Sequence, residues 1–538
     1  MTAPTAPRTL DELVFSNTYT SDLPGDESDE HRPRQVRNAL WSPVRPTPVA
    51  GPELIAWSGE MADVLGVDLT VDTERAARIL TGTELLEGGE PYAMRYGGHQ
   101  FGNWAGQLGD GRAIALGEVV AADGGHQTLQ LKGAGRTPYS RGADGLAVLR
   151  SSVREFLCSE AMHHLGIPTT RALSLCLTGE QVLRDMFYDG NPAHEPGAIV
   201  CRVAPSFVRF GSFQILAADQ EHDLLRALTD HVITRDFPHL GEPSTATRLA
   251  WLGEVVERTA LLMADWQRVG FVHGVMNTDN LSVLGLTIDY GPYGWLEDYD
   301  PGWTPNTTDA HGRRYRYGNQ PEVAWWNLVQ LANAMYPLIG EVEPLQDAVD
   351  RYQPAFESAW STAMTAKLGL REHRGDIDDE LVTDLWSTLQ AAETDMTIFF
   401  RDLADVAVSG GVHRDRDDRA LLEPLADAFY RPEQLTDEVA GRFATWIRRW
   451  ADRVESEGVG DPERAERMDR VNPRFVLRNY LAQLAIDDAE RGEHGHIAEL
   501  LDVLRRPYDD QPGRERFAER RPDWARTRAG CSMLSCSS

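Results

Sequence analysis

The sequence changes character near Asp219, and this change restricts the folds open to the chain. From Tyr96 to Gly145, glycine-rich turns separate short β-like runs. Beyond Asp219, apolar residues recur mainly at helical spacing. One prominent helix is predicted before that point, from Leu146 to Leu165, because Gly166 and Pro168 follow it. The sequence therefore predicts an α+β protein with a β-rich first part and a large helical second part.

The remaining elements are predicted from shorter patterns. Strands are expected at 113–120 and 128–131, and near 171–177 and 198–203. Helices are expected at 52–65, 252–266, 345–360, 381–389, 422–429 and 475–486. Residues 1–50 are rich in Pro, Thr and Asp, which favours an arm draped over a domain.

The charge balance argues against two classes of partner. Lys and Arg number 53 against 83 Asp and Glu, which gives a formal net charge of −30. Proteins that coat nucleic acid or bind anionic membranes present basic surfaces, so neither partner is expected. The first 30 residues lack the pattern of a signal peptide, and no membrane-spanning segment is expected. Five scattered cysteines are typical of a reducing compartment, so a cytoplasmic protein is predicted.

Two features of the β-rich part are typical of phosphate handling. Gly106-Gln-Leu-Gly109-Asp-Gly111-Arg112 allows a tight turn whose backbone N–H groups approach phosphate oxygens; the alternative is a plain hairpin turn. Lys132 ends the strand after that turn, where its amine reaches phosphate, unless it is a solvated surface residue. Its expected partner is Glu155 on the prominent helix, as in the Lys–Glu pair of kinases.

Two further motifs follow the apolar helix that ends near Trp266. His273 and Asn280 keep the spacing of the kinase motif His-Arg-Asp-x-x-x-x-Asn, but Val275 stands where a kinase carries its base. Val accepts no proton, and Asp279 is the nearest carboxylate able to replace that base. Asp289, in Ile-Asp-Tyr-Gly, resembles the metal-binding Asp of Asp-Phe-Gly, and Asn and Asp oxygens suit Mg²⁺.

The order of these four features predicts a protein-kinase-like, two-lobed fold. A β-rich N-lobe with one prominent helix is expected at 91–215, and a helical C-lobe at 216–500. Residues 1–90 are predicted to form an N-terminal extension, and 501–538 a C-terminal tail ending in Cys-Ser-Ser.

Other polar residues near the expected junction of the lobes need a role. Arg202 and Arg209 suit bidentate binding of phosphate, although each is alternatively a residue of a strand surface. Asp144-Gly145 either touches a nucleotide or caps the helix that starts at Leu146.

Longer strings of the sequence closely resemble the selenoprotein O family of protein adenylyltransferases. They are Tyr96-Gly-Gly-His-Gln-Phe-Gly102, Leu108-Gly-Asp-Gly-Arg112, Leu131-Lys-Gly-Ala-Gly-Arg-Thr-Pro-Tyr-Ser-Arg141, His273–Asn280 and Asp289-Tyr-Gly-Pro292. Segments from Phe15 to Asp26, from Asn472 to Ala482 and at the terminal Cys536-Ser-Ser are similar to its outer signatures. The resemblance covers nearly the whole chain.

This resemblance implies an enzyme that binds ATP turned around relative to a kinase. It implies AMP transfer to Ser, Thr or Tyr hydroxyls of protein substrates, with Mg²⁺, or Mn²⁺ as an alternative ion. By the same motifs, Asn280 and Asp289 would hold the metal, and Asp279 would accept the proton. The residues that would hold ATP are Gly109, Gly111, Arg112, Lys132, Asp144, Gly145, Arg202 and Arg209. A monomer is expected.

The chain departs from the selenocysteine-bearing members at its end. Cys536 stands before the final Ser-Ser, and no cysteine occurs between Arg202 and Gly530. A disulfide from the tail to the segment after Asp289 is therefore excluded, and Cys531 and Cys536 either pair with each other or stay free.

Two other functions stay open at this level. The first is a kinase-type phosphotransferase, against which Val275 counts because it removes the usual base. The second is a non-catalytic nucleotide-binding scaffold, against which the intact Lys and metal-ligand candidates count.

Overall fold

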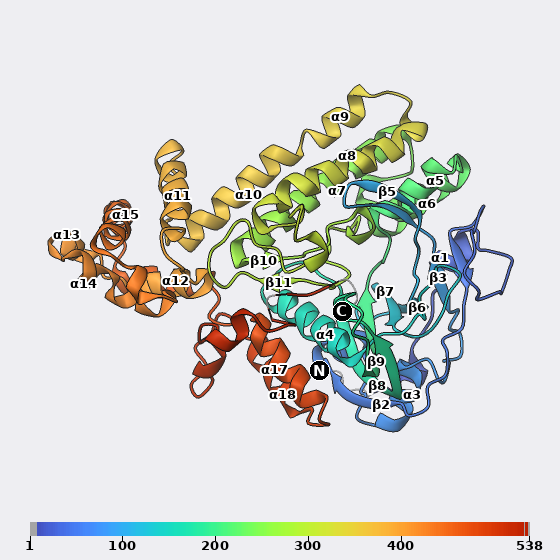
Figure 1. Ribbon diagram of the computed structural model, residues 1–538. Helices are drawn as coiled ribbons and strands as arrows, with labels where there is room; N and C mark the ends of the chain where they lie inside the picture. Colours follow the sequence, from blue (N-terminus) through green and yellow to red (C-terminus); the bar gives the residue numbers. More distant parts are fainter. Residues whose placement is uncertain (1–7, 532, 536–538) are drawn as a thin grey trace, which may run out of the picture.

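A seven-stranded antiparallel sheet forms the centre of the first part of the chain. The computed structural model describes residues 8–531 and 533–535 (Figure 1). In spatial order the strands are β1 (Trp41–Pro43), β3 (Tyr92–Met94), β6 (Ala113–Val120), β7 (His126–Lys132), β9 (Ala193–Ala204), β8 (Arg171–Arg184) and β2 (Glu53–Trp57). A separate two-stranded sheet consists of β4 (Gly97–Gln100) and β5 (Asn103–Gln107). The mixed α and β content expected from the sequence is confirmed.

The central strands lie where the sequence predicts them. Lys132 at the end of β7 pairs with Ala113 of β6 on one side and with Val200 of β9 on the other. β8 and β9 extend beyond their predicted ends, because they continue as a hairpin past the body of the sheet. Apolar residues of β6, β7 and β9 are almost completely buried, so this part of the sheet is a rigid platform for Lys132.

The segment before residue 91 contributes to the same sheet. The expected helix at 52–65 is wrong in its first half, because Glu53–Trp57 pairs with β8 as the edge strand β2. The second half is the helix α2 (Gly59–Leu65), whose start is capped by the Ser58 hydroxyl, which accepts the Met61 N–H. With α3 (Thr73–Leu80) it buries one face of the sheet.

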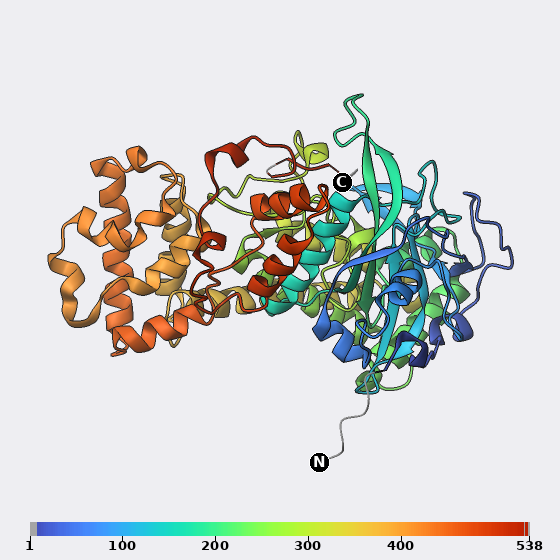
Figure 2. The ribbon, with the colours of Figure 1, turned by 90° about the horizontal axis from the view of Figure 1, so that it is seen from below.

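The prominent helix α4 (Leu149–His164) covers the other face of the sheet. It begins later than predicted, because Leu146 and Val148 pair as extended backbone with Ala134 and Gly197. Its outer side is covered in turn by α17 (Asn479–Ala489) and α18 (Gly495–Leu504), drawn in red beside it (Figures 1 and 2). The helix is thereby enclosed by segments from both ends of the chain.

Helices dominate the chain after residue 209. The first group comprises α5 (Phe210–Ala218), α6 (His222–Asp236), α7 (Thr245–Val269), α8 (Gln320–Ile339), α9 (Glu343–Val349) and α10 (Tyr352–Lys367). The single helix expected at 345–360 is therefore wrong, since two helices meet at Asp350 and Arg351. Pro354 lies in the first turn of α10, where a residue without an N–H is tolerated, and this favours a new start there.

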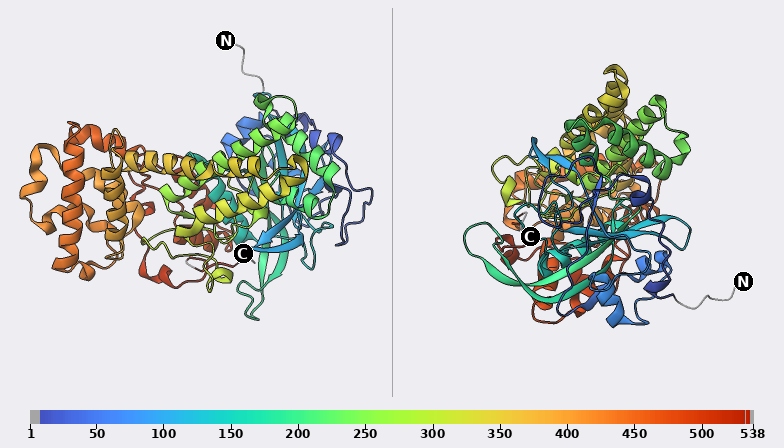
Figure 3. Two further views of the ribbon diagram at one scale, coloured as in Figure 1. Left: turned by 90° about the horizontal axis from the view of Figure 1, so that it is seen from above. Right: turned by 90° about the vertical axis from the view of Figure 1, so that its right-hand side faces the viewer.

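A distal group of helices has its own apolar core at one end of the molecule (Figure 3). It contains α11 (Asp376–Leu389), α12 (Met396–Asp402), α13 (Val412–Asp415), α14 (Asp418–Leu422), α15 (Asp437–Glu455) and α16 (Asp461–Asp469). The helix predicted at 422–429 is instead the end of α14 followed by a 3₁₀ helix at Glu423–Ala428, and Pro424 lies in its first turn. The helix expected from 475 begins at Asn479.

The C-terminal segment is held by ion pairs. Arg521 contacts Glu297, Asp298 and Glu393, and Arg528 contacts Asp487. Cys531 is buried, whereas Cys536 lies outside the described residues, so their pairing stays open. Within the described part of the chain, every helix is too short or too polar to span a membrane.

One carboxyl group in the distal group is poorly placed for ionisation. Burial, followed by the nearby carboxylates of Asp405 and Asp427, raises the pKa of Asp402 to about 7. An unfolded Asp titrates near 3.9, so the folded state is penalised above about pH 7, and the penalty shrinks as pH falls toward 4. Asp402→Asn is expected to raise stability by roughly 1 kcal/mol at pH 8 and by much less near pH 4.

Melting temperatures at the two pH values measure this effect. Asp123→Asn, in an exposed turn, is the control and should change neither value. A lower melting temperature for Asp402→Asn at pH 8 would contradict the prediction.

Candidate active site

A cavity of 930 Å³ lies between the sheet and the helical part of the chain. One wall contains the glycine turn before β6, the end of β7 and the loop at 136–146, and the other wall contains residues of 275–292. The predicted site residues that line it are Gly109, Gly111, Arg112, Lys132, Asp144, Gly145, Arg202, Asp279, Asn280 and Asp289. The two others, Glu155 and Arg209, contact lining residues from behind.

Lys132 lies at the centre of a network of ion pairs. Its Nζ is 2.7 Å from a carboxylate oxygen of Glu155 on α4 and 3.8 Å from Oδ1 of Asp289. The predicted Lys132–Glu155 pair is therefore present. Burial lowers the pKa of Lys132, and the carboxylate of Glu155 opposes this effect. The β-sheet and α4 together fix the amine at the cavity wall.

Both oxygens of Asp289 contact guanidinium groups. Arg202 donates to Oδ1 and also contacts Glu155, and Arg209 donates to Oδ2. Burial opposes ionisation of Asp289, but Arg209 and Arg202 outweigh it and hold its pKa well below the ordinary range. Its backbone is in the left-handed region, with φ of 57°, which is unusual for a residue other than glycine and is common at functional sites.

The two arginines are themselves held by buried neighbours. Arg202 donates to Gln130 Oε1, and the Arg209 guanidinium lies 4.4 Å from the centre of the Tyr96 ring. Arg209 also donates to the backbone oxygen of Asp279 at 2.8 Å. Gln130 and Tyr96 are parts of the site that the sequence analysis did not assign.

The charges of this cluster do not cancel. Lys132, Arg202 and Arg209 supply three positive charges, and Glu155 and Asp289 supply two negative ones. Among these ion-paired groups the cations outnumber the carboxylates, which favours an anionic ligand, and arginine suits phosphate in particular.

Asp279 lies in a short 3₁₀ turn, Thr278–Asn280, at the opposite wall. Its Oδ2 accepts the side-chain N–H of Gln100 at 3.3 Å, and its buried Oδ1 lacks a hydrogen-bond partner among the described residues. Burial raises the pKa of Asp279 to about 6. At neutral pH the group is ionised but basic, which suits a proton acceptor.

Asn280 and His273 shape the same turn. The Asn280 amide donates to Val275 O at 2.9 Å, so its side chain is oriented by the position where a kinase carries its base. His273 is buried, stacks on Trp266 and contacts the backbone oxygen of Ile288 at 2.8 Å. It therefore joins the segment of Asp279 to that of Asp289 as a structural residue.

The glycine turn is packed too tightly for side chains. A Cβ at Gly109 would lie 2.3 Å from the Tyr139 ring, and φ at Gly109 is 79°. A Cβ at Gly111 would lie 3.0 Å from the backbone oxygen of Tyr139. The turn thus brings bare backbone to the cavity beside Arg112, as phosphate binding requires.

Asp144 has a structural partner as well as a place on the cavity wall. Arg184 of β8 binds both of its oxygens, at 2.7 and 2.8 Å, and Asp144 Oδ1 accepts the Leu146 N–H at 3.0 Å. Gly145 has φ of 77°, and a Cβ there would lie 2.2 Å from Gly135 O. No local pattern predicts the Arg184 pair, because the strand expected near 171–177 ends before that residue.

The donor set fits a magnesium nucleotide. Asn280 and Asp289 offer amide and carboxylate oxygens, the hard ligands that Mg²⁺ prefers, and both line the cavity. Lys132, Arg112 and Arg202 line it as cations. Each oxygen of Asp289 contacts one arginine and has a second lone pair, so it can also be a ligand of the ion.

Lys132→Met removes the amine and keeps most of the side-chain volume. We expect ATP to bind about 10- to 100-fold more weakly, because a charge-assisted hydrogen bond contributes about 1.5–3 kcal/mol. Titration with a fluorescent ATP analogue measures this loss. The other lysine of the chain, Lys367, provides a matched control, since its Nζ contacts Asn472 far from the cavity. Equal ATP affinity of wild type and Lys132→Met would contradict the assignment.

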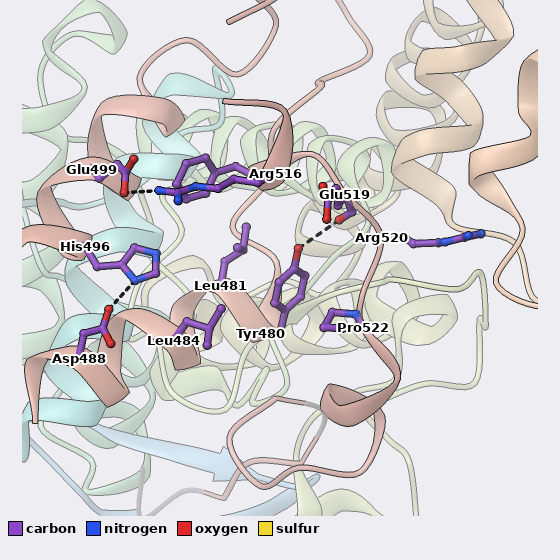
Figure 4. A pocket seen from close by; sticks show the side chains of 11 residues that line it. Tyr480, Leu481, Leu484, Asp488, His496, Glu499, Arg516, Glu519, Arg520 and Pro522 are labelled. Atoms are coloured by element: carbon purple, nitrogen blue, oxygen red, sulfur yellow. Dashed lines mark hydrogen bonds and ion pairs between the residues drawn. The ribbon is translucent and has the colours of Figure 1, made fainter. Parts of the chain in front are cut away.

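A second hollow, of 510 Å³, lies among α17, α18 and residues 516–522 (Figure 4). Its polar side chains pair with one another: Asp488 with His496, and Glu499 with Arg516. It holds no surplus of cations like that around Asp289, so the 930 Å³ cavity is the better candidate.

Comparison with known proteins gives matches over nearly the whole chain. The family model described as protein adenylyltransferase SelO matches residues 29–505. The chain is 58% identical over 539 residues to a protein nucleotidyltransferase YdiU of Rhodopirellula baltica, covering 98% of this chain and 99% of that one. It is 57% identical to the protein of that name from Aromatoleum aromaticum and 56% identical to one from Xanthomonas campestris pv. campestris, covering 98% of this chain and 100% of each relative.

Proposed function

Because the chain belongs to the SelO family of protein adenylyltransferases and is a nucleotidyltransferase, we propose that it transfers AMP from ATP to Ser, Thr and Tyr hydroxyls of proteins. The observation that carries the proposal is the pairing of two features in one cavity. A cationic cluster around Asp289 lies on one side, and the buried, unusually basic carboxylate of Asp279 lies on the other.

We propose that the fold is protein-kinase-like, with an N-lobe at 91–215 and a C-lobe at 216–500. The antiparallel sheet with the single helix α4, followed by many helices, supports this division. The Lys132–Glu155 pair supports it as well, since the same pair orients the phosphate-binding amine in kinases. Residues 1–90 and 501–538 are the proposed extensions.

ATP is proposed to lie with its phosphates on the cationic wall. Gly109, Gly111 and Gly145 offer close approach of the backbone, and Arg112, Lys132, Arg202 and Arg209 supply positive charge, with Asp144 at the edge. Pyrophosphate leaves with more negative charge than it carried in ATP. Fixed cations at that position therefore stabilise the transition state more than the ground state.

Asn280 and Asp289 are the proposed ligands of Mg²⁺, with Mn²⁺ as an alternative ion. When bound, the ion neutralises phosphate charge and polarises the phosphorus. The protein's part is to hold Asp289 ionised, which Arg202 and Arg209 do by lowering its pKa.

Asp279 is the proposed proton acceptor. The acceptor hydroxyl oxygen forms a bond to the α-phosphorus, and the bond from that phosphorus to the oxygen bridging to the β-phosphorus breaks. The hydroxyl proton passes to Asp279, and pyrophosphate carries away the electron pair of the broken bond. Val275, in the position of the kinase base, takes no part in proton transfer.

ATP labelled at either the α- or the γ-phosphorus tests this reaction. With casein as acceptor and Mg²⁺ present, label is expected in protein from α-labelled ATP alone, with one pyrophosphate released per AMP attached. Equal labelling from the γ-position would instead establish a phosphotransferase. Absence of label from both positions, with ATP still bound, would establish a nucleotide-binding scaffold.

The protein is proposed to act as a monomer in the cytoplasm.

A further inference from the structure

The glycine-rich string Tyr96–Gly102 contains β4, and the reaction described above leaves it without a role. β4 and β5 form a hairpin, with β5 labelled in Figure 1, that rests on the turn carrying Asp279. The backbone N–H of His99 donates to Thr278 Oγ1 at 2.7 Å, and that of Phe101 donates to Asn277 Oδ1 at 3.2 Å. The hairpin is thus fastened to the residues on the N-terminal side of Asp279.

Two residues of β4 contact the carboxylate itself. Side chains two apart in a strand share a face, and Gly98 and Gln100 both face Asp279. Gln100 Nε2 donates to Oδ2 at 3.3 Å, and a Cβ at Gly98 would lie 2.4 Å from Oδ1. The carboxylate therefore lies between a hydrogen-bond donor and a gap that only glycine leaves open.

This packing makes the two oxygens of Asp279 unequal. Oδ1 is buried against Gly98 and has no hydrogen-bond partner in the described part of the chain. Asp279 and Gln100 both line the cavity, and Oδ2 is the carboxylate oxygen that joins them. A carboxylate oxygen has two lone pairs, and Gln100 occupies one of those on Oδ2, leaving the second for an incoming hydroxyl.

We propose that Gln100 and Gly98 are positioning residues that fix Oδ2 of Asp279 as the proton-accepting atom. The inference rests on the proposed role of Asp279 and adds the means by which its carboxylate is aimed. Gln100 keeps its own proton throughout, and the hydroxyl proton goes to Oδ2. Without these contacts the carboxylate rotates about its last bond, and fewer encounters with the acceptor are productive.

Gln100→Met tests the hydrogen bond, because Met has a similar length and volume but no N–H. We expect kcat for AMP transfer to casein to fall about 10- to 100-fold and KM for ATP to stay within about twofold. Gly98→Ala should likewise lower kcat and leave KM for ATP unchanged, since its methyl group displaces Oδ1. A merely structural loss would change nucleotide affinity and melting temperature together with kcat.

Asn103→Ala is the matched control. Asn103 belongs to the same hairpin and is exposed, and its side chain contacts the backbone oxygen of Phe101, away from Asp279. Its kcat should equal that of wild type. Gln100→Met with wild-type kcat, or with kcat and ATP affinity reduced in parallel, would overturn the proposal.

A double-substitution cycle separates this inference from the proposed function. If Gln100 acts through Asp279, the variant Asp279→Ala with Gln100→Met is no slower than Asp279→Ala alone. If Asp279→Ala is inactive and the Gln100 effects are absent, the positioning role fails and the proposed function stands. If Asp279→Ala transfers AMP normally, AMP transfer stands, but Asp279 is not the proton acceptor and the positioning role fails with it.

Discussion

Replacing Asp279 with Ala is expected to lower kcat for AMP transfer by about 10²–10⁴-fold, the usual contribution of a general base. Its carboxylate is buried at the cavity wall, and burial raises its pKa to about 6, so it is both ionised at pH 7.5 and basic. The cationic wall proposed to hold ATP is left intact. Transfer of α-labelled AMP to casein, measured beside a titration of ATP binding, should therefore show a lost rate and a retained affinity.

Asp123→Asn serves as the control for this experiment, because Asp123 lies in an exposed turn between β6 and β7. It should leave both the rate and the affinity unchanged. A variant Asp279→Ala that transfers AMP within about threefold of wild type would remove Asp279 from the reaction and direct the search to another carboxylate of the cavity.

Replacing Asp289 with Ala is expected to have two large effects. Transfer of AMP should fall more than about 10²-fold, because the proposed metal loses its only charged protein ligand. Stability without ligands should also fall by about 3–5 kcal/mol, the usual cost of removing one partner of a buried ion pair. This loss of stability is expected because the guanidinium groups of Arg202 and Arg209 would remain buried without the carboxylate that neutralises them.

Asp219→Asn separates the two effects. Asp219, at the end of α5, pairs with the buried Arg95, and neither residue lines the cavity, so its loss should lower the melting temperature and leave AMP transfer intact. If Asp289→Ala keeps the wild-type melting temperature, the arginine contacts are weaker than the structure indicates. If it keeps the wild-type rate, the metal is held elsewhere.

Local pattern was sufficient to predict the parts of the site that lie at the ends of regular elements. Lys132 ends a strand whose apolar alternation is plain in the sequence, and Glu155 lies in a helix with clear ends, so their contact followed from a known pairing. Asn280 and Asp289 follow an apolar helix at a recognisable spacing. In each case a short stretch of sequence carries the necessary information.

Contacts between distant segments could not be predicted in this way. Gln100 and Asp279 are 179 residues apart, and Gln130 and Arg202 are 72 apart, so no periodicity in either segment reveals them. The helix expected at 52–65 is wrong over β2 for the same reason. The residues of β2 also fit a helix, and only pairing with β8 decides the outcome, as tertiary contacts commonly override local preference.

The enclosure of α4 has a consequence for the timing of synthesis. The ribosome completes α4 at His164, but α18, which covers its outer side, ends at Leu504. At about 5–20 residues per second, roughly 20 to 70 s separate the two events. During that interval the helix that carries Glu155 lacks part of its support, so a nascent chain already contains every proposed ATP ligand before it can hold them rigidly. Catalytic competence should therefore arise late, after nearly all of the chain has been made.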